Sequence, residues 1–147
     1  MKARELMTER PDTVTEKDTL KTAAQRMRDL NVGLIPVVDD AGTGRLTGVI
    51  TDRDIAIRHV AEGHGDDCCV GDEMTRGPLY TVTPDDDQSA VMAKMQEGQV
   101  RRVPVLEGDR LVGIIAQADL AVETSDASAE EVERTVEAIS EPAEPER

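Results

Sequence analysis

The stretch Gly48-Val49-Ile50-Thr51-Asp52-Arg53-Asp54 has a partner later in the chain, Gly-Ile-Ile-Ala-Gln-Ala-Asp at residues 113–119. In both, apolar residues after a glycine indicate the end of a buried strand. In the first copy Thr51 can cap a following helix, and Asp54 lies one turn further along the same face. A hydroxyl beside free backbone N–H groups suits a phosphate, and a carboxylate can accept two hydrogen bonds from a ribose. The motif is open to two interpretations, a nucleoside site or an ordinary helix start in which Asp54 complements the helix dipole.

The sequence around this motif repeats. Three pairs of segments match: 13–15 with 81–83 and 34–38 with 102–106, both at an offset of 68 residues, and 46–50 with 111–115 at an offset of 65. The change of offset falls in the turn-rich residues 40–44, where length variation is tolerated. The chain is therefore organised as two tandem repeats.

Each repeat has the pattern β-α-β-β-α. In the first, the periodicities predict strands at 13–15, 35–38 and 45–50 and helices at 19–30 and 52–62. In the second, they predict strands at 80–82, 102–106 and 111–115 and helices at 88–97 and 117–122. Residues 4–7 and 70–74 are expected to form short helical turns. The predicted fold is α/β (α+β), with the two repeats related by a pseudo-two-fold.

These elements divide the chain into repeat 1 at residues 1–62, a linker at 63–69, repeat 2 at 70–122, and a tail at 123–147. The tail has capping-box spacing at 128–131, which predicts an acidic helix over about 128–140 followed by disorder.

The charge of the chain limits its partners. Its 147 residues carry a formal charge of −14, and the tail alone holds nine acidic residues against two arginines. Such a chain repels nucleic acids and anionic lipids at long range. No apolar stretch is long enough for a membrane span, no signal-peptide pattern is present, and the only two cysteines are adjacent. We expect a cytoplasmic protein with no nucleic acid or membrane partner.

The repeat that ends in Gly-apolar-apolar-Thr-x-x-Asp resembles the cystathionine-β-synthase (CBS) domain, and two in tandem resemble a CBS pair, or Bateman module. The likeness covers about residues 1–122, and stretches such as 50–55 and 99–105 resemble small stand-alone pairs. It implies a module that binds adenosine-containing ligands (AMP, ADP or ATP, sometimes NAD or S-adenosylmethionine) in clefts between its repeats, with no cofactor required.

The resemblance also implies site residues. Asp54 and Thr51 would serve one cleft and Asp119 the other, the aspartates holding ribose. The first strands of the repeats would touch adenine, and the sequence leaves open which strand serves which cleft. A basic residue three places before the hairpin proline would meet phosphate. The residues expected to bind ligand are Thr13, Val14, Thr51, Asp54, Thr81, Val82, Arg101 and Asp119.

The second motif departs from the family pattern, because Ala116 stands where the first has Thr51. The missing hydrogen bond would cost roughly 1.5–3 kcal/mol if it reached a charged group. The Thr51/Asp54 cleft is therefore expected to bind more tightly. Arg101 is the first cation expected to contact phosphate, with Arg53, Arg58 and His59 in reserve.

Four potential metal ligands, His59, His64, Cys68 and Cys69, lie within eleven residues. Their spacing is not a standard zinc pattern, and adjacent cysteines rarely chelate one ion well. We therefore expect no metal site, with an intermolecular disulfide in oxidising preparations as an alternative role for the cysteines. No Walker motif, dinucleotide-binding turn or catalytic triad pattern is present, so no enzyme is expected.

The sequence favours a regulatory nucleotide-sensing module that acts through conformation or oligomer state, on a partner in trans. The alternative is a structural or interaction protein with no physiological nucleotide. Apolar helix positions such as residues 23–24 and 90–95 are expected to lack cover within one chain. Because CBS pairs commonly stack into a flat disc through such helices, we expect a homodimer.

Overall fold

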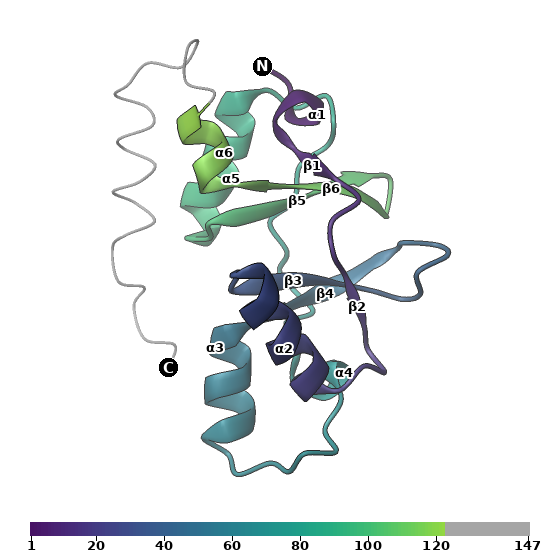
Figure 1. Cartoon of the computed structure of the whole chain (residues 1–147). Helices are drawn as coiled ribbons and strands as arrows, with labels where there is room; N and C mark the ends of the chain where they lie inside the picture. The colour runs from purple at the N-terminus through teal and green to yellow at the C-terminus, as the bar shows by residue number, and fades with distance from the viewer. Residues whose placement is uncertain (123–147) are drawn as a thin grey trace. The chain divides into compact units, whose positions relative to one another are not determined.

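The computed structural model describes residues 1–122, and the predicted acidic tail helix lies outside them. The chain forms two compact units (Figure 1). Among the described residues, unit 1 contains 1–10, 80–108 and 112–122. Unit 2 contains residues 11–79 and 109–111. Within residues 1–122, no helix combines the length and the apolarity that crossing a membrane requires.

Unit 2 is built on a three-stranded sheet in the order β2-β3-β4. Strand β2 (Val14–Thr15) runs parallel to β3 (Leu34–Val38), which forms an antiparallel hairpin with β4 (Leu46–Thr51). Helix α2 (Leu20–Leu30) begins at Thr19, whose side chain accepts a hydrogen bond from the N–H of Thr22, and ends at Asn31 in the left-handed conformation. Four predicted elements of repeat 1, three strands and one helix, are thus present to within one residue at each end.

The closing helix of this unit differs from the prediction. Residues 52–62 were expected to be one ordinary helix, but only α3 (Asp52–Asp54) has α-helical hydrogen bonding. Residues 55–60 form a π-helix, η1 (Ile55–Val60), with i→i+5 bonds such as Ala61 N–H to Ala56 O at 2.9 Å. Apolar periodicity over so short a segment does not distinguish the two, whereas π-helical turns are rare and often occur at functional sites.

Unit 1 repeats the arrangement with the order β1-β6-β5. Strand β5 (Arg102–Glu107) pairs with β6 (Arg110–Ala116) in a second hairpin, and β1 (Thr8–Glu9) lies antiparallel on the other edge of β6. The helices are α1 (Ala3–Leu6), α5 (Gln88–Gly98) and α6 (Gln117–Val122). The strand predicted at 80–82 is reduced to one bridge between Val82 and Val105, parallel in direction.

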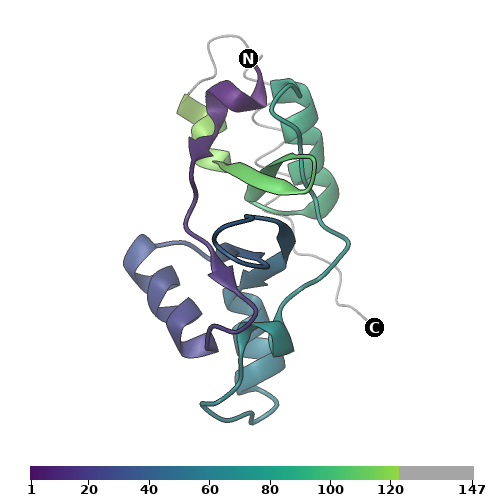
Figure 2. The ribbon, with the colours of Figure 1, turned by 90° about the vertical axis from the view of Figure 1, so that its right-hand side faces the viewer.

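In each unit, the outer edge of the sheet pairs with a segment that belongs to the other sequence repeat. Thr75, which follows α4 (Val70–Glu73), pairs with Val49 at the edge of β4, with both N–H···O distances at 2.9 Å. Thr8, which follows α1, pairs with Ile114 in the same way. Residues 1–10 therefore belong to unit 1, together with most of repeat 2. The short helix α4, which follows the linker, belongs to unit 2, together with most of repeat 1 (Figure 2). The compact units divide the chain differently from the sequence repeats.

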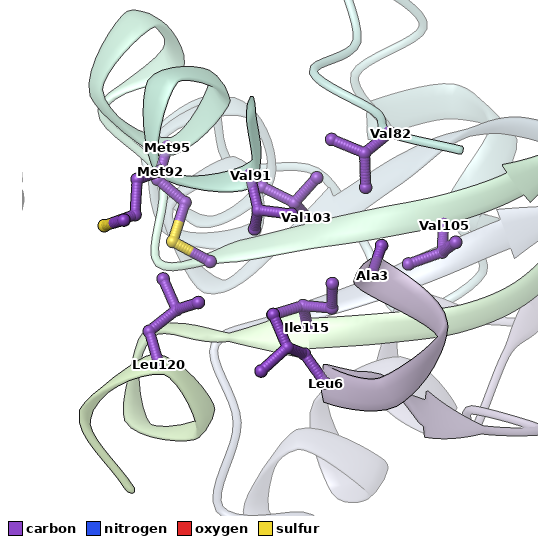
Figure 3. Packing of buried hydrophobic residues seen from close by; sticks show 10 residues of the cluster. All are labelled: Ala3, Leu6, Val82, Val91, Met92, Met95, Val103, Val105, Ile115 and Leu120. Carbon is purple, nitrogen blue, oxygen red and sulfur yellow. The ribbon is translucent and has the colours of Figure 1, made fainter. Parts of the chain in front are cut away.

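Each unit has its own aliphatic core. In unit 1, side chains from α1, α5, α6 and both long strands meet around Val103 and Ile115 (Figure 3). Val91, Met92 and Met95 belong to this core and are at most 5% exposed. The expectation that helix positions 90–95 lack cover within one chain was therefore wrong for these three residues, because α1 and α6 pack on them. The large apolar side chains that are exposed in residues 1–122 are Leu30, Ile57 and Val60.

Candidate functional site

Thr51 and Asp54 form a reciprocal capping box at the start of α3. The Thr51 hydroxyl accepts a hydrogen bond from the Asp54 N–H at 3.0 Å, and Asp54 Oδ2 accepts one from the Thr51 N–H at 3.1 Å. The interpretation of the motif as an ordinary helix start thus explains these two hydrogen bonds. It does not explain why Asp54 is only 7% exposed, because a carboxylate that only caps a surface helix has no need of burial.

Two further side chains surround the Asp54 carboxylate. The Thr75 hydroxyl lies 3.1 Å from Oδ1 and 3.2 Å from Oδ2, so its one proton is shared between the two oxygens. The guanidinium Nε of Arg58 lies 3.7 Å from Oδ1, and the same side chain donates to the Met74 carbonyl at 3.3 Å. Asp54 thus links α3, η1 and the segment after α4.

The second motif is a reduced version of the first. Ala116 N–H donates to Asp119 Oδ2 at 2.8 Å, which matches the Thr51–Asp54 backbone contact, but Ala116 offers no hydroxyl in return. Asp119 is half-buried. The Arg101 carbonyl accepts a hydrogen bond from Gln117 N–H at 2.8 Å, so the structure brings Arg101, which is exposed, to the start of the helix that carries Asp119.

The predicted first strands lie away from the motifs of their own units. In unit 2, β3 lies between β2 and β4, so Thr13 and Val14 are on the opposite side of β3 from Thr51. Val14 is buried, and the Thr13 carbonyl accepts a hydrogen bond from Arg26. In unit 1, Val82 pairs with β5, which separates it and Thr81 from β6 and Asp119.

Comparison with known proteins identifies this architecture. The family profile described as "CBS domain" matches residues 3–59 and 70–126. The chain belongs to the CBS-domain family. Hypoxic response protein 1 of Mycobacterium tuberculosis is 40% identical over 81% of this chain and 82% of its own, and the CBS domain-containing protein YhcV of Bacillus subtilis is 38% identical over 81% and 82%.

Solved structures agree with this assignment. The crystal structure of Hypoxic Response Protein I with two coordinated zinc ions is 37% identical, with a TM-score of 0.76 over 84% of this chain and 98% of that one. The structure of CBSX2 in complex with AMP has a TM-score of 0.70 over 82% of this chain and 93% of that one. At 24% identity that likeness shows the shared fold alone.

In unit 2, the folded chain also gathers four potential metal ligands. His59, His64, Cys68 and Glu73 each offer one donor atom, and these atoms all lie within 4.8 Å of one another. Three of the four were considered from the sequence and set aside because of their spacing. Glu73 was not considered, and Cys69 is not part of the cluster.

The Cys68 thiol has the properties of a structural cysteine in the absence of a metal. Burial raises its pKa, and the neighbouring carboxylates of Asp67, Asp72 and Glu73 raise it further. A reactive cysteine needs the opposite shift, which cations or a helix N-terminus supply. The thiol is therefore protonated at neutral pH and is a poor nucleophile.

Thr75, whose hydroxyl faces the Asp54 carboxylate, was not predicted from the sequence. Met74-Thr75 repeats Met7-Thr8 at an offset of 67 residues, so self-similarity contained the signal. Both threonines follow a short helix and pair with the last strand of a repeat. Nothing in the sequence indicates that this strand belongs to the other repeat.

Proposed function

We propose that this CBS pair is a regulatory module that senses adenosine-containing nucleotides, with the Thr51/Asp54 motif as its principal site. The observation that carries the proposal is the buried, hydrogen-bonded Asp54 carboxylate at a helix start. CBS pair proteins are regulatory modules. We place this chain among the non-catalytic ones and expect it to act in the cytoplasm, on a partner protein in trans.

The hydrogen bonds around Asp54 leave room for a ligand. A carboxylate offers about four acceptor positions on its two oxygens. Oδ2 takes the Thr51 N–H and shares the Thr75 proton, whereas Oδ1 has only its share of Thr75 and an arginine at 3.7 Å. Oδ1 can therefore accept a hydrogen bond from a ribose hydroxyl. The crystal structure of CBSX2, which shares this fold, is in complex with AMP, and this supports the proposal.

The second motif offers a site that we expect to bind nucleotide more weakly but that has a cation nearby. It lacks the hydroxyl of Thr51, but Arg101 is held at the start of the Asp119 helix. In a chain of charge −14, an anionic ligand depends on such local cations. We propose that Arg101 contacts phosphate there, and that Thr13, Val14, Thr81 and Val82 contribute to adenine binding as the family resemblance implies.

The test is thermal unfolding of the full chain with 1 mM AMP, ADP, ATP, NAD or S-adenosylmethionine. A ligand at a hundred times its dissociation constant stabilises the native state by about 2.7 kcal/mol. For a protein of this size, such a gain raises the melting temperature by roughly 5–10 °C. No shift with any of these ligands would favour the alternative, a structural or interaction protein without a nucleotide.

The Arg101→Ala variant distinguishes the contribution of phosphate from that of the nucleoside. If Arg101 contacts phosphate, the variant weakens ATP binding and leaves adenosine binding unchanged in the same titration. Equal weakening of both ligands would assign Arg101 a structural role instead.

We also propose that the chain forms a homodimer, as CBS pairs commonly do. Ile57 and Val60 are 51% and 67% exposed on η1, which leaves an apolar face on that helix. Light scattering of the untagged protein at micromolar concentration should give twice the chain mass of 16.0 kDa. A mass equal to one chain would exclude the dimer.

A further inference from the structure

We infer that His59, His64, Cys68 and Glu73 form a zinc-binding site within unit 2. All four belong to unit 2, so one unit supplies the complete set of ligands. The four donors of this chain carry the inference, and nucleotide binding is not required for it.

The donor atoms are already close to the spacing that zinc needs. With Zn–N, Zn–O and Zn–S bonds of about 2.0–2.3 Å, the ligand atoms of a tetrahedral site lie roughly 3.3–3.8 Å apart. In the structure all four lie within 4.8 Å of one another. Side-chain adjustments of about 1 Å would therefore bring them onto one ion, with no rearrangement of the backbone.

The backbone explains why residues with an unusual sequence spacing meet. His59 and His64 are five apart, which is the repeat of the i→i+5 hydrogen bonds in η1, and His64 N–H donates to His59 O at 3.1 Å. Gly63 has φ of +71°, a conformation that glycine adopts without strain, and it turns the chain between them. The two imidazole rings have their centroids 6.0 Å apart.

The other two ligands are held by the packing of the linker on the sheet. The Cys68 carbonyl accepts a hydrogen bond from Leu20 N–H at 3.2 Å, which fixes Cys68 beside the start of α2. Glu73 is in α4, directly before the segment that pairs with Val49. Both contacts join segments that are distant in the sequence. The four ligands therefore do not have the sequence spacing of a standard zinc motif.

The polar groups of the cluster are poorly satisfied by protein alone. Glu73 is only 6% exposed and has one close partner, His64 Nδ1 at 2.5 Å. His59 Nδ1 is buried 4.0 Å from the same carboxylate oxygen and has no hydrogen-bond partner. Buried carboxylates and imidazole nitrogens are costly without partners. A cation among the four donors would satisfy both groups.

The donor set selects the metal. Two imidazoles, one thiolate and one carboxylate suit Zn²⁺ and disfavour Mg²⁺ and Ca²⁺, which prefer oxygen ligands alone. Four protein ligands also leave no open position for a substrate, which is characteristic of a structural zinc. The ion would join η1, the linker and α4, and η1 also carries Arg58, which lies beside Asp54.

The experiment titrates the chelator-treated, untagged full chain with Zn²⁺ by calorimetry and with Co²⁺ by visible absorption. We expect one ion per chain, a thiolate-to-cobalt charge-transfer band, and a higher melting temperature with Zn²⁺. Cys68→Ser should abolish the band and weaken Zn²⁺ binding by at least tenfold, since even outer-sphere changes cost 10–100-fold. Cys69→Ser is the matched control and should behave as the unmodified chain.

His59→Ala provides a second variant whose folding is checked by circular dichroism, and it should also weaken Zn²⁺ binding by at least tenfold. The inference is overturned if the unmodified chain binds no Zn²⁺. It is also overturned if Cys68→Ser and Cys69→Ser bind Zn²⁺ equally, because the ion would then lie elsewhere.

Discussion

Asp54→Ala is expected to lower nucleotide affinity by at least tenfold and to reduce the free energy of unfolding by about 2 kcal/mol. The stability loss follows because the Thr75 hydroxyl and the Thr51 N–H lose their acceptor, and an unsatisfied polar group costs roughly 1–3 kcal/mol when buried. The affinity loss follows if the ribose binds to Oδ1. Isothermal titration with the nucleotide that stabilises the chain measures the first effect, and urea unfolding measures the second.

Two variants separate binding from stability. Asp119→Ala removes the equivalent, half-buried carboxylate of the second repeat, and we expect it to lower affinity less than Asp54→Ala, because Asp119 works beside Ala116 and not beside a threonine. Thr75→Val removes the hydroxyl that faces Asp54 and keeps the carboxylate, so it should leave nucleotide affinity within about threefold. Equal losses for Asp54→Ala and Asp119→Ala would show that the two sites are ranked wrongly. An equal loss for Thr75→Val would show that Asp54 acts only through the protein.

Local patterns in the sequence were sufficient for most elements of the fold. Leu20–Leu30 and Gln88–Gly98 were predicted to within one residue at each end, because periodicity, a capping side chain and a left-handed residue at the end all act within a few residues. The two hairpins followed from apolar runs separated by a glycine-containing turn.

What the sequence did not reveal depends on contacts between distant segments. The pairing of Thr75 with Val49 completes the surroundings of Asp54, and the position of α4 brings Glu73 to His59. Neither contact leaves a periodic signal, because each depends on which strand edge the linker reaches after it leaves the first repeat. The π-helical turns of η1 were missed because apolar periodicity over so short a segment does not distinguish a π-helix from an α-helix.

Gly48→Ala is expected to destabilise unit 2 by about 3 kcal/mol, at the upper end of the usual cost of overpacking. A Cβ at this position would lie 2.3 Å from Met74 Cε and 2.4 Å from the Thr75 carbonyl oxygen. The methionine side chain can move, but the carbonyl accepts the hydrogen bond from Val49 N–H that holds the edge of β4. Relief of the clash therefore breaks the Val49–Thr75 pairing and withdraws the Thr75 hydroxyl from Asp54.

Gly113→Ala is the matched control, because Gly113 has the same place in the second repeat. The three atoms nearest to its Cβ would be side-chain atoms of Met7, with Sδ at 2.4 Å and Cβ at 3.0 Å. Methionine has three rotatable bonds and adapts to such changes, so we expect a loss of about 1 kcal/mol. Urea unfolding of both variants, followed by far-ultraviolet circular dichroism, should give a clearly lower midpoint for Gly48→Ala. If the urea midpoint of Gly48→Ala equals or exceeds that of Gly113→Ala, the segment after α4 can move away from β4 without a loss of stability. The pairing of Thr75 with β4 would then not be what holds it beside Asp54.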